Sequence, residues 1–156
     1  MRKFVFSFIV LLFLVSCSSG SSDFRSVKWG MSMDEVIKAE AKEQNNYVSK
    51  TSDFLKYKIT LGEYHVRLTY QFKNNRLESG TYVYDAENET LRQQFIDSIK
   101  SALNKKYGDG GKVEKYGTIF SWNWETSNTV IKLSPKDGIT AVVVYRGKLS
   151  ASSENL

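Results

Sequence analysis

Apolar and polar residues alternate along this chain with two different periods, which predict strands and helices respectively. Residues 64–73 change one by one between apolar and polar types. This period of two is typical of a strand with one buried face and one wetter face. By the same criteria, and from the turn residues between the runs, five further strands are predicted at residues 54–61, 76–84, 118–125, 128–133 and 139–146.

The helical period occurs in two segments. Ser32 and Glu35 have the spacing of a capping box, which predicts a helix over residues 33–44. A longer apolar stripe with a spacing of three and four residues predicts a second helix over residues 85–107, and Gly108 provides its C-terminal stop.

The predicted order is α-β-β-β-α-β-β-β, an internal pseudo-repeat. It predicts the α+β class, with one antiparallel sheet and two helices packed on one face of it. We expect residues 24–148 to form a single domain. The Ser-rich residues 149–156 are expected to form a disordered tail.

The first residues form a different pattern. Arg2 and Lys3 precede an apolar run over residues 4–15, which is shorter than the roughly 20 residues of a membrane-spanning helix. The pattern predicts a signal peptide over residues 1–16, followed by a flexible linker over residues 17–23.

The motif Leu14-Val15-Ser16-Cys17 resembles the lipobox of bacterial lipoproteins. The resemblance implies that the thiol of Cys17 is lipidated, that the chain is cleaved before it, and that the new amino group is acylated. Several acyl chains give a stable membrane anchor, where one chain is marginal. In Gram-negative lipoproteins a non-acidic residue such as Ser18 usually implies the outer membrane, so a position facing the periplasm or the cell surface is expected.

Charge and cysteine usage exclude several classes of function. The formal net charge is +5; removal of Arg2 and Lys3 leaves 20 basic and 17 acidic residues, a net charge of +3. The basic residues are scattered, so nucleic-acid binding is not expected. Cys17 is the only cysteine in the sequence, and its lipidation removes disulfide and thiol chemistry. No cofactor is predicted.

Catalytic and metal-binding residues are also sparse. His65 is the only histidine, and without a second His or a free Cys it is interpreted as a surface residue rather than a metal ligand. The acidic residues at the two helix starts have a capping role, and Asp109 lies in a Gly-flanked turn, so no catalytic pair is assigned. The chain is therefore expected not to be an enzyme.

Aromatic residues offer a candidate binding surface. Trp122 and Trp124 share one face of a predicted strand, and Tyr82 and Tyr84 share one face of another. Two interpretations remain open: these side chains fill the core under the helices, or some of them, with Arg67, line the open sheet face. Tyr, Trp and Arg dominate the binding energy of many interfaces.

Residues 24–36, with the sequence FRSVKWGMSMDEV, resemble the "WGMS-x-x-E-V" opening of small bacterial envelope proteins. A Lys-Tyr-Gly at residues 106–108, a strand containing Trp, and a last strand ending in Tyr agree with this resemblance. The helix-plus-sheet repeat is similar to the β-lactamase-inhibitor-protein-like architecture. The likeness implies a fold and no activity.

Three functions are compatible with these features. The first is a membrane-anchored envelope lipoprotein that acts as a non-catalytic binding module for an envelope protein, or less readily for a glycan. The second is a hydrolase of cell-wall glycans that uses Asp and Glu residues. The third is a structural tether in which the domain is only a spacer.

Overall fold

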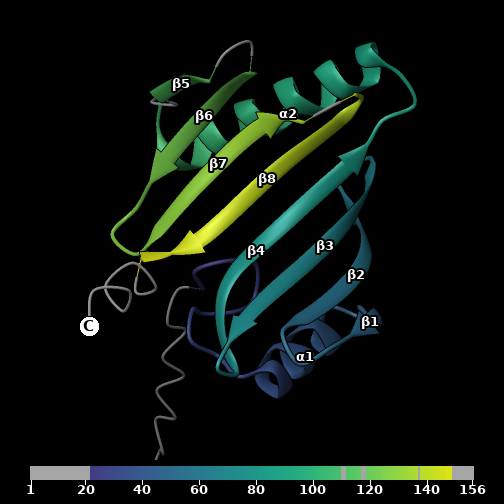
Figure 1. Cartoon of the computed structure of the whole chain (residues 1–156), viewed down its shortest axis with the longest axis vertical. Coiled ribbons are helices and arrows are strands. Elements are labelled where there is room, and N and C mark those ends of the chain that lie inside the picture. The colour runs from purple at the N-terminus through teal and green to yellow at the C-terminus, as the bar shows by residue number, and fades with distance from the viewer. Residues whose placement is uncertain (1–21, 110–111, 117–118, 137, 149–156) are drawn as a thin grey trace, which may run out of the picture.

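The computed structural model describes residues 22–109, 112–116, 119–136 and 138–148. Within these ranges the chain forms two α-helices and one eight-stranded antiparallel sheet (Figure 1). In chain order the elements are α1 (Met33–Lys42), β1 (Tyr47–Lys50), β2 (Phe54–Leu61), β3 (Tyr64–Lys73), β4 (Arg76–Asp85), α2 (Glu89–Tyr107), β5 (Lys112–Tyr116), β6 (Ile119–Glu125), β7 (Thr129–Pro135) and β8 (Thr140–Gly147).

The sheet consists of two four-stranded meanders that meet in the middle. Its strand order is β1-β2-β3-β4-β8-β7-β6-β5, so the last strand of each meander lies at the centre and the first at an edge. β4 and β8 join the two halves through seven residue pairs, from Ser79 opposite Arg146 to Asp85 opposite Thr140. The predicted α+β class and the internal repeat are confirmed.

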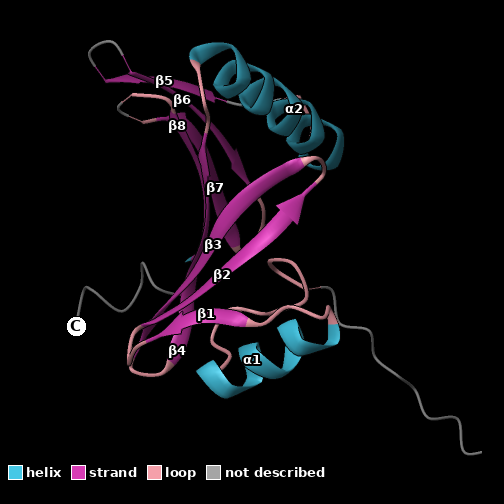
Figure 2. Cartoon of the chain, turned by 90° about the vertical axis from the view of Figure 1, so that its right-hand side faces the viewer, coloured by secondary structure: helices cyan, strands magenta, loops and turns pink. Residues whose placement is uncertain are grey.

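Both helices lie on the same side of the sheet, as predicted (Figure 2). We call this side the covered face and the opposite side the open face. α1 lies near the half that contains β1 to β4, while α2 contacts β6, β7 and β8 and also reaches β4. One face of every central strand is thus left without a helix over it.

The element boundaries correct the sequence prediction in three places. α1 ends at Lys42 rather than at residue 44, and Gln44 already has a positive φ of 60°. α2 begins at Glu89 rather than near residue 85, because β4 extends to Asp85 and the side chain of Asn88 caps the helix at Leu91 N, 2.9 Å away. The edge strands β1 and β5 were not predicted. All four residues of β1 are exposed, so its sequence has no alternation to detect.

The predicted capping box of α1 is present. The backbone N–H of Ser32 donates to Glu35 Oε2 at 2.8 Å, and Glu35 N–H donates back to the Ser32 hydroxyl at 3.4 Å. These bonds satisfy N–H groups that a helix start leaves without intrahelical partners.

A loop over residues 22–31, which we call the N-terminal loop, packs on the covered face at the centre of the sheet. Phe24 is 3% exposed, and its ring lies where a Cβ atom on Gly80 would stand only 2.1 Å away. Trp29 packs in the same way on Gly147 and donates from Nε1 to Thr129 Oγ1 at 2.8 Å. The loop therefore fills the gap between the two helices and joins both halves of the sheet.

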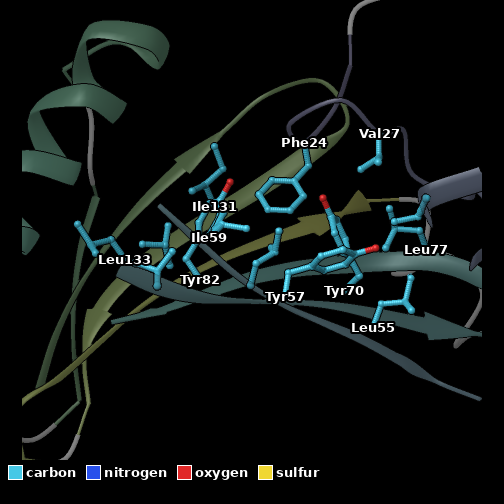
Figure 3. Packing of buried hydrophobic residues seen from close by; sticks show 14 of the residues in the cluster. Phe24, Val27, Leu55, Tyr57, Ile59, Tyr70, Leu77, Tyr82, Ile131 and Leu133 are labelled. Carbon is cyan, nitrogen blue, oxygen red and sulfur yellow. The ribbon is translucent and has the colours of Figure 1, made fainter. Parts of the chain in front are cut away.

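The alternation of the strands places the core between the sheet and the helices. Figure 3 shows Phe24 and Tyr82 among the buried side chains of this region, together with residues of β2, β3 and β7. In β2 the buried positions are Leu55, Tyr57 and Ile59, and the residues between them face the open side. β3 shows the same alternation, whereas in β8 Val142 is buried although it lies on the open face between the buried Ala141 and Val143.

Candidate binding surface

The four aromatic residues considered for a binding surface lie on the covered face. Tyr82 is 5% exposed and Trp124 4% exposed. Trp124 donates from Nε1 to Asn104 Oδ1 on α2 at 3.0 Å, and Lys100 of α2 lies 5.1 Å above the ring of Trp122. Tyr84 stacks on Phe95 of α2 with ring centroids 4.5 Å apart. The open-face interpretation of these residues is therefore wrong, because α2 and the N-terminal loop cover the face to which they point.

Arg67 is the one residue of that group on the open face. It lies in β3, directly opposite Lys58 of β2. Its Nη2 pairs with Asp85 Oδ2 at 2.6 Å, yet 59% of its side chain remains exposed. The structure thus separates Arg67 from the aromatic residues and places it beside other cations.

Arg67 lies in a hollow of the open face that we call the basic recess. Three cross-strand pairs form its floor: Lys56 with Thr69, Lys58 with Arg67, and Thr60 with His65. Val48 of β1 and Val83 of β4 flank it on either side. The hollow consists of two adjoining depressions of about 180 and 480 Å³, both lined by Lys58 and Arg67.

The cations of the basic recess are only partly neutralised. Among the described residues, Lys56 and Lys58 have no carboxylate within 4 Å, and Asp85 pairs with Arg67 alone. Like charges directly opposite each other on neighbouring strands destabilise a sheet. The Lys58–Arg67 pair is therefore an unfavourable arrangement for the fold, and an anion bound between the two residues would relieve it.

Hydroxyl groups lie beside these charges. Thr60 Oγ1 is 3.4 Å from His65 Nδ1, and Thr69 lies next to Lys56. His65 is exposed, and the described residues hold no group of three His, Cys, Asp or Glu side chains arranged to bind a metal. The basic recess therefore combines positive charge with hydroxyl and imidazole groups, which can donate or accept hydrogen bonds.

The centre of the open face is apolar. Val83 of β4 lies opposite Val142 of β8, and Val144 follows two residues later. Val130 of β7 is 39% exposed on the same face. Val83, Val142 and Val144 therefore lie beside the basic recess. Val130 lies further away, directly opposite Arg146 and next to Glu125, which forms an ion pair of 2.8 Å with Lys148.

A second group of charged residues is buried on the covered face. Glu40 of α1 is fully buried and accepts from Arg25 Nε at 2.9 Å and from Asn45 Nδ2 at 2.7 Å. The hydroxyl of Tyr70 also donates to Glu40. Burial and the nearby Glu40 carboxylate raise the pKa of Tyr70 above its usual range.

Arg25 completes this buried network. Burial alone would lower its pKa, but hydrogen bonds to Glu40 and Tyr82 raise the pKa above its ordinary value. Arg25 also has a left-handed backbone with φ of 53°, an uncommon conformation for a residue with a side chain. Arg25 comes from the N-terminal loop and Tyr70 from β3, so the network around Glu40 attaches the N-terminal loop to α1 and β3.

The candidate catalytic carboxylates are dispersed. Glu35 is engaged in the capping box, and Glu89 forms an ion pair with Arg92. Asp97 and Asp109 border an open depression beside α2, but both are exposed. Asp97 lies in the middle of α2, and Asp109 follows the end of the helix after Gly108.

Sequence reasoning missed Lys56 and Lys58. Both occupy polar positions in the alternation of β2, where Leu55, Tyr57 and Ile59 are buried. The alternation alone predicts that both lysines lie on the solvent-facing side of the strand. The opposition of Lys58 to Arg67 could also have been predicted, because a two-residue turn at Gly62-Glu63 pairs Leu61 with Tyr64 and so fixes the register of the hairpin.

The predicted lipidation site Cys17, with the signal peptide, the start of the linker and the C-terminal tail, lies outside the described residues. Within the described ranges, neither helix has the length and apolar character needed to cross a membrane. Comparison of the chain with protein-family models, curated proteins and solved structures finds no match.

Proposed function

We propose that this chain is a lipid-anchored lipoprotein of the bacterial envelope whose α+β domain is a non-catalytic module that binds a partner protein through its open face. The main observation that supports this proposal is the basic recess. Lys58 and Arg67 lie opposite each other at a cost to the sheet, and both line a solvent-open hollow. Unfavourable local arrangements of this kind are expected at functional sites.

The position of the anchor supports the same proposal. Cys17 stands at the start of the predicted linker, and Phe24 is the first buried core residue in the part of the chain that the structure describes. Residues 18–23 span at most about 20 Å even when fully extended, and Asp23 is already held in the N-terminal loop, where it accepts from Trp29 N–H at 2.9 Å. The lipid would therefore hold the domain close to the membrane, most simply the outer membrane as Ser18 implies, while the open face remains available to a partner.

The anchor can be tested separately from the binding surface. Cys17→Ala should abolish incorporation of labelled palmitate and move the protein out of the membrane fraction. A matched Ser19→Ala variant should behave as the unaltered protein. Membrane retention and labelling of the Cys17→Ala variant would contradict the lipoprotein proposal.

The binding surface can be tested in cells by site-specific photo-crosslinking. A photoreactive amino acid in place of Thr69 lies in the basic recess, and one in place of Ser101 lies on the exposed outer side of α2. We expect a discrete protein adduct from position 69 and none from position 101. The absence of an adduct at position 69, or the same adducts at both positions, would overturn the proposal.

A further inference from the structure

The cations of the basic recess form a regular row. Lys56 and Lys58 are two residues apart on β2 and point to the same face. In an antiparallel sheet this separation is about 6.8 Å along the strand. Arg67 lies beside Lys58, directly opposite it on β3. The recess therefore presents positive charge along the strand direction at the repeat of an extended chain.

The shape of the basic recess narrows the choice of ligand. Val48 on one side and Val83 on the other flank a depression of about 180 Å³, which can take up side chains that project from a ligand. A flat surface such as a lipid bilayer does not enter such a hollow. The flanking valines also offer apolar contacts to the stems of acidic side chains.

From this match of charge and spacing we propose that the basic recess binds an extended segment of a partner polypeptide that carries Asp or Glu at alternate positions. Side chains at alternate positions of an extended chain project to one side at the same repeat of about 6.8 Å. Two successive carboxylates would then meet Lys56 and Lys58, and the second would also reach Arg67. This inference rests on the proposed binding function and names its partner class.

Asp85 provides a second test of the proposal. It is the carboxylate that neutralises Arg67 in the free protein, and 53% of its side chain is exposed. A bound acidic segment would compete with Asp85 for the guanidinium. Removal of the Asp85 charge should therefore strengthen binding, an effect that general damage to the fold would not produce.

The experiment uses the mature lipoprotein in micelles of a non-ionic detergent and a fluorescent peptide of alternating Glu and Ser residues. A peptide of the same composition with a Glu-Glu-Ser-Ser repeat serves as its control, since it has no two Glu residues two positions apart. Fluorescence anisotropy measures both affinities over a range of salt concentrations. We expect the alternating peptide to bind about threefold or more tightly than the control, and its affinity to fall as salt screens the charges.

Variants then locate the site. Lys58→Glu should weaken binding of the alternating peptide by about tenfold. Lys38→Glu, an equal charge change on the exposed side of α1, should leave it within about twofold. Asp85→Asn should strengthen it by about threefold. Thermal unfolding of each variant checks that the fold is retained.

Competition distinguishes the sources of negative charge. Inorganic phosphate and glycerol phosphate, which is a lipid headgroup without acyl chains, should displace the peptide only through their ionic strength. Displacement at low concentration by either compound, equal binding of both peptides, no binding of either, or equal effects of Lys58→Glu and Lys38→Glu would overturn the inference. If the Thr69 crosslink forms in cells while the peptides fail, the binding function stands and only the partner class is wrong.

Discussion

Two ion pairs with the same chemistry lie on opposite faces of the sheet and have opposite surroundings. Arg25 and Glu40 lie on the covered face, where Glu40 is fully buried and Tyr70 and Asn45 complete its hydrogen bonds. Arg67 and Asp85 lie on the open face, where more than half of each side chain is exposed. Burial makes the first pair part of the fold, and exposure leaves the second free to exchange its partner.

The surroundings determine what each pair costs when it is broken. Removal of one member of a buried pair leaves an uncompensated charge in an environment that solvates it poorly. Removal of one member of an exposed pair leaves a charge that water stabilises, so little stability is lost. We therefore expect the ion pair on the covered face to stabilise the fold and the ion pair on the open face to be able to exchange its partner. Mutations that break each pair test this difference.

The largest expected effect is at Glu40. Glu40→Ala should reduce the free energy of unfolding by about 3–5 kcal/mol, because Arg25 and the hydroxyl of Tyr70 lose their buried acceptor. Urea unfolding followed by tryptophan fluorescence measures this change. Glu63→Ala, at an exposed turn, is the matched control and should change stability by less than about 0.5 kcal/mol. A loss below about 1 kcal/mol for Glu40→Ala would show that Glu40 is not a structural residue.

A smaller effect is expected where the N-terminal loop meets the sheet. Gly80→Ala places a Cβ atom 2.1 Å from the ring of Phe24, so the ring must move out of its site. We expect a loss of about 1–3 kcal/mol, the usual range for overpacking of a core. Phe24→Leu in the same chain should recover part of the loss, and a double-mutant cycle measures the coupling. Additive effects of the two substitutions would contradict direct packing of Phe24 on Gly80.

The fold class was predictable because its determinants are local. The alternation in β3 and the capping box of α1 lie within short segments, and both are present in the structure. β1 was not predictable, since its four residues are all exposed and pair only through the register with β2. A strand without alternating buried and exposed residues cannot be predicted from its own sequence, because only its pairing with a neighbouring strand defines it.

The candidate site was less predictable for a physical reason. Alternation shows that Trp122 and Trp124 share a face, but it does not show which face the helices cover. That choice depends on the packing of α2 and of the N-terminal loop over the sheet, which involves residues far apart in sequence. Glu40 was missed for the same reason, because a charged residue is buried only when partners such as Arg25 and Tyr70 arrive from other elements.

Stability at alkaline pH should depend on a buried tyrosine of the covered face, Tyr57. Burial, together with the charge of Glu40, raises the pKa of Tyr57 to about 12. An unfolded tyrosine ionises near pH 10, so the contribution of Tyr57 to stability is complete below pH 10 and is lost as the pH rises from about 10 to 12. Tyr57→Phe should therefore make the alkaline loss of stability less steep in urea titrations at several pH values.

Tyr57→Phe has a second expected consequence at neutral pH. Among the described residues, the buried Tyr57 hydroxyl has no hydrogen-bond partner, so its removal should leave stability unchanged or raise it by about 1 kcal/mol. Thr81→Ser, a conservative change on the open face, is the control and should leave the alkaline dependence as it is. An unaltered alkaline slope in Tyr57→Phe would show that this hydroxyl ionises as it does in water.

The smallest expected effect on stability is at Asp85. Asp85→Asn should change the free energy of unfolding by less than about 1 kcal/mol, since its pair with Arg67 is exposed and an amide can still accept from Thr140 Oγ1. The same unfolding assay as for Glu40→Ala measures it. A loss comparable to that of Glu40→Ala would mean that both ion pairs are structural, and Arg67 would then not be free to exchange its partner. A near-zero change would instead mean that the fold does not depend on the Arg67–Asp85 pair, so that Asp85 can release Arg67 to a ligand without unfolding the sheet.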